Sequence, residues 1–193
     1  LELTEAQGGT VTVIHVGDAS TEPTIRKALA IGATDAVRVN AAPRDAYFVA
    51  KQIAAYAKDQ GFDMIMTGRE SIDYNGSQVA SMVGELLDLP SISIVKVMNV
   101  EGTTATLDRE IEGGKEVITC PLPLVVSATE GMAEARIPNM RGIMSARTKP
   151  LTTIEAIEVP TLQQFVKYDK PAARSQVKLV AADDVKGLVD LLH

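Results

Sequence analysis

The sequence Thr10-Val11-Thr12-Val13-Ile14-His15-Val16-Gly17-Asp18 decides the fold class. Its first part is β-branched and apolar with little alternation, and it ends at a glycine followed by an aspartate. That pattern is typical of a strand buried on both faces of a parallel sheet. We therefore expect His15, which lies inside the run, to be a core histidine without a catalytic role.

Helices and strands alternate on the C-terminal side of this run. The expected elements are a helix over residues 24–33, a strand over 36–39, a helix over 46–58, a strand over 62–67 and a helix over 76–87. Short connections between alternating elements predict an α/β fold with a doubly wound, Rossmann-like parallel sheet, because parallel neighbours need a helical crossover. Ligands of such sheets gather at the carboxyl ends of the strands.

On the N-terminal side, residues 1–9 predict the last turns of a helix that Gly8 and Gly9 close. The sequence thus begins inside an element, and we expect anything encoded upstream, a targeting segment included, to be missing from it.

The pattern changes after Pro90. We expect antiparallel strands, including a hairpin, over residues 92–97, 103–110 and 115–119, and then a buried strand over residues 122–128. An exposed arm follows over residues 130–150, and a strand over 154–159. The end of the sequence predicts a linker over residues 171–175, a strand over 177–180 and a terminal helix over 183–193. We expect residues 1–150 to form the α/β domain. Residues 151–193 are expected to form an extended C-terminal arm, here called the tail, that docks away from this domain.

Composition excludes several classes of function. The 193 residues carry a net charge of −6 and no Trp, which argues against nucleic acid as a partner. No apolar run approaches the roughly 18 residues that cross a bilayer, so we expect no membrane insertion. The single cysteine, Cys120, predicts neither a disulfide nor a cysteine-based metal site.

The stretch from Gly68 to Gln78 joins the end of a predicted strand to the start of a predicted helix. Free backbone N–H groups, glycines and the Ser77 hydroxyl suit a phosphate there. The alternative is that Asn75, Gly76 and Ser77 only turn and cap the helix, and spacing alone favours it. Residues 17–20 follow the first strand and could contact the same ligand.

We find no self-contained catalytic centre: no Walker motif, no nucleophile elbow and no paired acid and base. Arg109 and Glu110 stand beside a hairpin tip, where an ion pair is the default interpretation. Residues 136–144 combine apolar, flexible and cationic side chains. They form either a docking surface or a loop whose methionines pack back on the domain.

Three blocks of sequence resemble the β-subunit family of electron-transfer flavoproteins, and the resemblance covers nearly the whole chain. They are residues 25–33; residues 68–78 with Ser71-Ile72-Asp73; and Arg109-Glu110-Ile111-Glu112-Gly113-Gly114, followed by residues 122–126 and 143–150. The resemblance implies an AMP-binding domain that pairs with an α subunit carrying redox-active FAD. It further implies electron transfer from acyl-CoA dehydrogenases or related flavin dehydrogenases to a respiratory acceptor.

By the same resemblance, the cofactor-binding residues are Val16, Gly17, Gly68, Ile72, Asp73, Tyr74, Asn75, Gly76, Ser77, Gln78, Val79, Ala80 and Ser81, with Arg109 and Glu110 facing the flavin. The partner-docking residues are Met140, Arg141 and Ile143, of which Met140 takes the place of the apolar anchor that inserts into dehydrogenases. No catalytic residue and no metal ligand is implied.

The sequence departs from the family in two places. The family's first strand and a nucleotide-contacting loop are missing, and Tyr74-Asn75-Gly76-Ser77 replaces a commoner acidic or polar run. Relatives that bind a second FAD and split electron pairs have an Asp-Gly-Asp-Thr loop, which this sequence lacks, so AMP is preferred. The rival class is a stand-alone adenine-nucleotide-binding stress protein. We expect a cytoplasmic location in a bacterium, or the mitochondrial matrix in a eukaryote.

Overall fold

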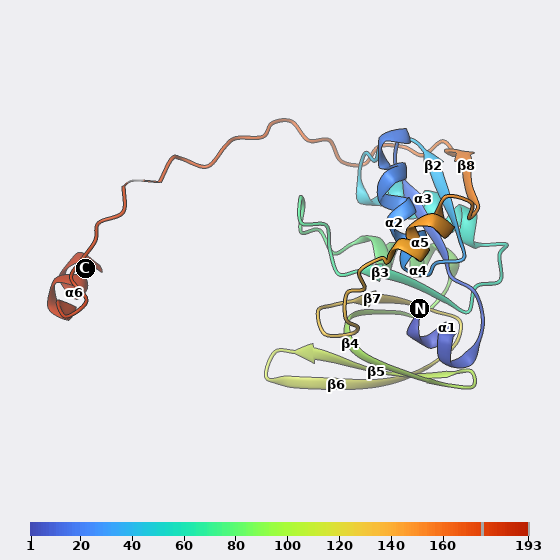
Figure 1. Cartoon of the computed structure of the whole chain (residues 1–193), viewed down its shortest axis with the longest axis horizontal. Helices are drawn as coiled ribbons and strands as arrows, with labels where there is room; N and C mark the ends of the chain where they lie inside the picture. Colours follow the sequence, from blue (N-terminus) through green and yellow to red (C-terminus); the bar gives the residue numbers. More distant parts are fainter. Residues whose placement is uncertain (175, 193) are drawn as a thin grey trace.

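A computed structural model describes residues 1–174 and 176–192, whose strands form two sheets (Figure 1). The first is parallel throughout and has the order β1-β2-β8, with β1 Thr12–Val16, β2 Asp35–Asn40 and β8 Leu151–Glu155. The second has the order β3-β7-β4-β5-β6, with β3 Met64–Gly68, β4 Ser91–Glu101, β5 Thr104–Ile111, β6 Gly114–Pro121 and β7 Leu124–Ala128. In it, β7 is parallel to both β3 and β4, whereas β5 is antiparallel to β4 and β6.

The helices are α1 Glu2–Gln7, the short 3₁₀ turn η1 Ala19–Thr21, α2 Glu22–Ile31, α3 Ala46–Ala57, α4 Val79–Leu87, α5 Met140–Ala146 and α6 Val185–Leu192. Local sequence sets their ends. The Asp45 side chain accepts a 2.7 Å hydrogen bond from the Phe48 N–H and caps α3. Gly32 ends α2 with a φ of 139°, which side chains disfavour.

Helices cover both faces of the first sheet. Leu29 of α2 and Ala146 of α5 share a cluster with Ala36 on one face of β2, whereas Phe48 of α3 packs with Val39 on the other face. This is the doubly wound α/β arrangement, so the predicted fold class is confirmed.

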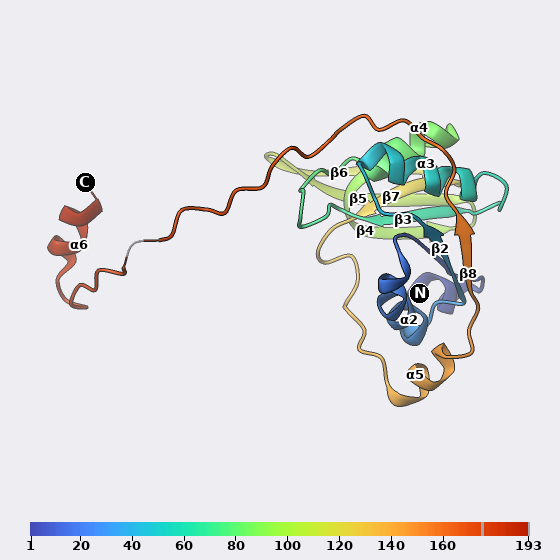
Figure 2. The ribbon, with the colours of Figure 1, turned by 90° about the horizontal axis from the view of Figure 1, so that it is seen from above.

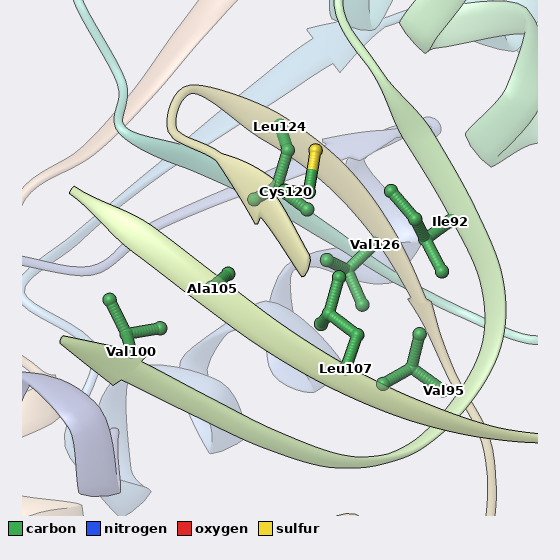
Figure 3. Packing of buried hydrophobic residues seen from close by; sticks show 8 residues of the cluster. All are labelled: Ile92, Val95, Val100, Ala105, Leu107, Cys120, Leu124 and Val126. Carbon is green, nitrogen blue, oxygen red and sulfur yellow. The ribbon is translucent and has the colours of Figure 1, made fainter. Parts of the chain in front are cut away.

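The second sheet encloses the largest apolar cluster, on one face of β7 (Figure 3). Its buried members come from four strands: Ile92, Val95, Val100, Ala105, Leu107, Cys120, Leu124 and Val126. Val125 points to the opposite face, where it packs with Ala80 and Val83 of α4. β7 is therefore buried on both of its faces.

Helix α3 joins the two halves. Its residue Ile53 packs with Ile14 of β1 in one cluster and with Ile65 of β3 in another. The sheets share no strand pair among the described residues, so the single continuous sheet suggested by the sequence is replaced by two sheets under one helix.

Two strand predictions were wrong. The strand expected over residues 154–159 is β8, Leu151–Glu155, because hydrogen bonding to β2 starts at the pair Ala36 and Leu151. Residues 177–180 are irregular, and Val177 and Leu179 are exposed, since no neighbouring strand pairs with them (Figure 1).

Two further expectations need correction. His15 is exposed and not a core residue, because it lies near the carboxyl end of the edge strand β1, where its ring is only partly covered. Helix α4 starts at Val79, three residues after the expected start at Gly76, because residues 75–78 stay in an irregular loop.

Beyond β8 the chain passes over α3 and leads away to α6, which lies apart from the rest of the described chain (Figure 2). Ser175 and His193, at the ends of the expected linker and terminal helix, lie outside the described residues. The division of the chain after residue 150 stays a prediction. Within the described ranges, no helix is both long and apolar enough to cross a bilayer.

Candidate functional site

One row of paired residues crosses the second sheet at the carboxyl end of β3. Gly68 pairs with Ala128, Ala128 with Val95, and Val95 with Arg109. Since neighbouring strands lie about 4.8 Å apart, Gly68 and Arg109 are separated by roughly 14 Å along this row. The structure therefore brings the predicted loop entrance and the predicted flavin-facing hairpin to one edge of one sheet.

The loop of residues 69–78 begins where this row begins, and every one of its residues is exposed. The backbone N–H groups of Tyr74 and Asn75 both donate to the Ser71 carbonyl, which folds the first part of the loop into a turn. Asn75 and Ser77 have left-handed backbones with φ of 47° and 49°. These conformations aim the second part of the loop toward the start of α4.

The N-terminus of α4 has no side-chain cap. The N–H groups of a helix's first turn have no partner inside the helix, and they favour an anion. In α4 this turn contains Val79, Ala80 and Ser81, of which Ala80 is buried and Ser81 is exposed. The arrangement can accept a phosphate through backbone groups.

Two charged side chains of the loop, Arg69 and Glu70, pair with each other. The Ser77 hydroxyl donates a 2.9 Å hydrogen bond to Glu70, whose carboxylate lies 3.6 Å from the Arg69 guanidinium. The predicted role of the Ser77 hydroxyl as a phosphate donor would require it to leave Glu70. The backbone amides are therefore the better-placed donors.

Two ion pairs fix the hairpin at the far end of the row. Arg109 lies opposite Glu116 on β6 and donates to it at 2.6 Å. Glu110 accepts from Lys96 of β4, and this hydrogen bond, followed by the charge of Glu110, raises the pKa of Lys96. Glu130, just after β7, also raises it. Glu110 thus lies in a small charged group near the start of the arm.

Val16 ends β1 in the other sheet and Gly17 follows it, and no strand pairing of the described residues connects either to residues 68–81. The buried Arg38 side chain donates to the Gly17 carbonyl at 3.0 Å. Partial burial of the His15 ring, and then the charge of Arg38, lower the pKa of His15. A side chain at Gly17 would clash with His15, since an added Cβ would lie 2.6 Å from its Nε2.

The arm of residues 130–150 is held at two places. Arg136 makes a bidentate ion pair with Glu5 of α1, at 2.6 and 2.7 Å. Arg26 of α2 donates to the carbonyls of Ala146 and Lys149, both at 2.7 Å. These contacts fix the arm on the N-terminal part of the chain.

Between these anchors the arm presents its three predicted docking residues. Met140 is 73% exposed and starts α5, which the Asn139 side chain caps by accepting from the Gly142 N–H. Arg141 and Ile143 are also exposed. These side chains do not pack back on the domain, which speaks against the second of the two interpretations left open by the sequence. Their role in docking stays a prediction.

The sequence interpretation missed one contact of the 69–78 loop. The ring of Tyr74 stacks on Phe165, with centroids 4.8 Å apart, and Phe165 stacks on Tyr168 at 5.5 Å. The only sequence signal was a pair of aromatic residues in a polar stretch of the tail, and periodicity does not interpret such a pair. Two surface hollows lie elsewhere, one beside β4 and β5 and one beside Arg44.

Comparisons with known proteins agree with the sequence resemblance. The chain matches the family model of the electron transfer flavoprotein domain over residues 1–159. It is 35% identical to the electron transfer flavoprotein subunit beta of Bacillus subtilis (strain 168), over 100% of this chain and 80% of the relative.

Two further relatives carry the same name. The protein from Syntrophomonas wolfei is 31% identical over 86% of this chain and 66% of its own length. The protein from Sus scrofa is 29% identical over 91% of this chain and 72% of its own length. Because the family model matches most of the sequence, and the Bacillus relative aligns with all of it, this chain belongs to the electron transfer flavoprotein domain family.

Proposed function

We propose that this chain is the β subunit of a heterodimeric electron-transfer flavoprotein. In this role it binds AMP and completes the surroundings of an FAD held mainly by the α subunit. It performs no bond-breaking reaction of its own. The support is family membership and the shared name of relatives that align with 86% or more of the chain.

The observation that carries AMP binding is the uncapped start of α4 directly after the exposed 69–78 loop. The amides of residues 79–81 would hold the phosphate, and Gly76, which has no atom within 4 Å of an added Cβ, allows close approach. These backbone amides are donors that suit an anion, and they need no metal ion to bind it. The nucleotide would then remain bound as a structural group.

The proposed flavin contact rests on the row across the second sheet. Arg109 and Glu110 lie on the same sheet edge as the loop entrance, and each has an ion-pair partner that fixes its side chain. The hairpin would thus offer fixed charges to the isoalloxazine ring. When bound, FAD supplies the one-electron chemistry.

The proposed electron donors are acyl-CoA dehydrogenases or related flavin dehydrogenases, and the acceptor is respiratory. Met140 would be the docking residue, since it is an exposed, flexible apolar side chain on an anchored arm. Of residues 151–193, the part beyond the contacts with α3 would dock on the α subunit through the exposed apolar side chains of α6. The cytoplasmic location stays a prediction.

Identification of the nucleotides released when the purified complex is denatured tests this function. We expect AMP in a 1:1 ratio to this chain, and FAD only when the α subunit is present. FAD in twice the amount of the α subunit would instead assign the chain to the bifurcating relatives. Release of neither nucleotide, or ATP hydrolysis by this chain alone, would contradict the proposal.

A further inference from the structure

The tail segment of residues 156–168, which we call the strap, runs along α3 toward its N-terminus. The buried Gln52 side chain both donates to and accepts from the backbone of Ile157, at 2.9 Å each way. Two residues later, Val159 is buried in a cluster with Phe48. The strap is therefore built into the fold where it leaves β8.

Next along the strap, the Asp45 carboxylate holds the backbone. One oxygen caps α3, and the other accepts from the N–H groups of Leu162 and Gln163 at 2.8 and 3.1 Å. The Arg44 guanidinium lies over the Phe48 ring and donates to the Thr161 hydroxyl at 3.3 Å. One buried carboxylate thus fixes the direction in which the tail continues.

That direction leads to the 69–78 loop. Phe165 comes two residues after the Asp45 contact at Gln163 and stacks on Tyr74 with an angle of 23° between the ring planes. Tyr168 also stacks on Phe165, with ring centroids 5.5 Å apart. Figures 1 and 2 show the loop tip and the tail running near each other in both views.

The loop depends on such a contact because it has little support of its own. Residues 71–78 are all exposed, and the open space around Gly76 gives the loop tip no packing. Two of its residues have left-handed backbones, although neither is glycine. An aromatic ring held from outside restricts the conformations that such a segment can adopt.

We propose that Phe165 is a positioning residue of the nucleotide site: through Tyr74 it holds the loop in the shape that presents the amides at the start of α4 to an adenylate. This inference rests on the proposed AMP binding. Because coupling between two sites is reciprocal, AMP also stabilises the seated strap. The tail leads onward to α6, so docking of the tail and retention of the nucleotide reinforce each other.

The test measures AMP affinity by calorimetry on the purified, nucleotide-stripped complex. Phe165→Ala weakens binding about 3- to 10-fold, the range expected for loss of one aromatic pair. Phe165→Tyr retains the parent affinity because it keeps the ring. Val166→Ala, a change at the neighbouring, 96% exposed residue, leaves affinity unchanged. Parent-like AMP affinity in Phe165→Ala overturns the proposal.

Tyr74→Ala and the double variant complete a mutant cycle. If the two rings act as one unit, the double variant binds AMP no more weakly than either single variant. Additive losses would mean that Phe165 acts by another route, and would overturn the role of Tyr74.

Trypsin cleavage separates this inference from the proposed function. If the parent binds no AMP, the proposed function fails, yet cleavage after Arg69 still reports on the loop. Faster cleavage there in Phe165→Ala than in Val166→Ala supports positioning by the strap, and equal rates overturn it. If the parent binds AMP, the nucleotide slows cleavage after Lys167 in the parent and not in Phe165→Ala.

Discussion

The guanidinium of Arg38 is 5% exposed and donates to four groups: Glu22, the Gly17 carbonyl, Asn40 and Thr153. These partners lie in α2, just after β1, at the end of β2 and in the middle of β8. One side chain thus fixes the carboxyl edge of the first sheet.

Arg38→Ala is expected to lower the free energy of unfolding by about 1–3 kcal/mol, because it leaves the buried Gly17 carbonyl without a donor. Urea denaturation measures the loss. Glu22→Gln is the matched control and costs less than about 1 kcal/mol, since the Glu22 side chain is 41% exposed. Equal denaturation midpoints for parent and Arg38→Ala would show that Arg38 does not hold this edge.

Asp45 makes the strap sensitive to acid. Burial raises the pKa of Asp45, but hydrogen bonds from the N–H groups of Phe48, Leu162 and Gln163 outweigh it and lower the pKa below its usual value. A lowered folded-state pKa means that the stabilisation is complete at neutral pH and is lost as the pH falls through that pKa.

Hydrogen exchange of the Leu162 and Gln163 amides checks this. Their protection factors are expected to stay constant from pH 7 to about pH 5 and to fall only below about pH 4. In Asp45→Ala the protection is low at every pH. Protection that persists in Asp45→Ala would mean that the strap is held by other groups.

At the scale of single elements, the arm of residues 130–150 carries the exposed Met140 between two anchored positions. Met140→Asp is expected to slow reduction by a dehydrogenase at least 10-fold, because it places a charge at the centre of the docking contact. Nucleotide content and flavin absorption stay unchanged. Stopped-flow reduction by a partner dehydrogenase measures the rate.

Met140→Leu is the control for that change, since it keeps an apolar side chain of similar volume and should keep the parent rate. If Met140→Asp is reduced as fast as Met140→Leu, then Met140 has no part in docking.

Elements fixed by nearby residues could be predicted from sequence. Helix α3 follows from Asp45 and its apolar face, and the hairpin of β5 and β6 follows from Gly113 and Gly114. β8 could be bounded only by its pairing with β2, more than a hundred residues earlier. Residues 177–180 have strand-like composition, but no partner strand gives them hydrogen bonds.

The candidate site likewise has parts that could be predicted from sequence and parts that could not. The loop after β3 could be placed from its glycines and its position between a strand and a helix. The stack of Tyr74 on Phe165 could not, since it joins segments far apart in the sequence. The row of paired residues from Gly68 to Arg109 could not be predicted either, because it depends on the order of the strands in the sheet. Spacing along the sequence does not determine that order.

At the scale of the whole molecule, α6 carries exposed apolar residues at helical spacing and lies apart from the rest of the described chain. Leu188→Asp is expected to weaken association with the α subunit at least 10-fold, because it charges the face proposed to dock. Mass photometry of the mixed subunits measures association.

Asp190→Asn, on the same helix, is the control and should associate like the parent, since it changes a polar position without charging the apolar face. Unchanged association of Leu188→Asp would exclude α6 from the interface.

The strand order also affects how the chain is made. β3 pairs with β7 and β2 pairs with β8, so each sheet has a strand that waits for a partner synthesised much later. A growing chain therefore exposes unpaired strand edges until about residue 155 has left the ribosome, a period during which such edges favour aggregation. Slow translation after Pro121 would lengthen that exposure, and a shortage of chaperones would lower the yield of this protein more than that of one whose strands pair with their neighbours in sequence.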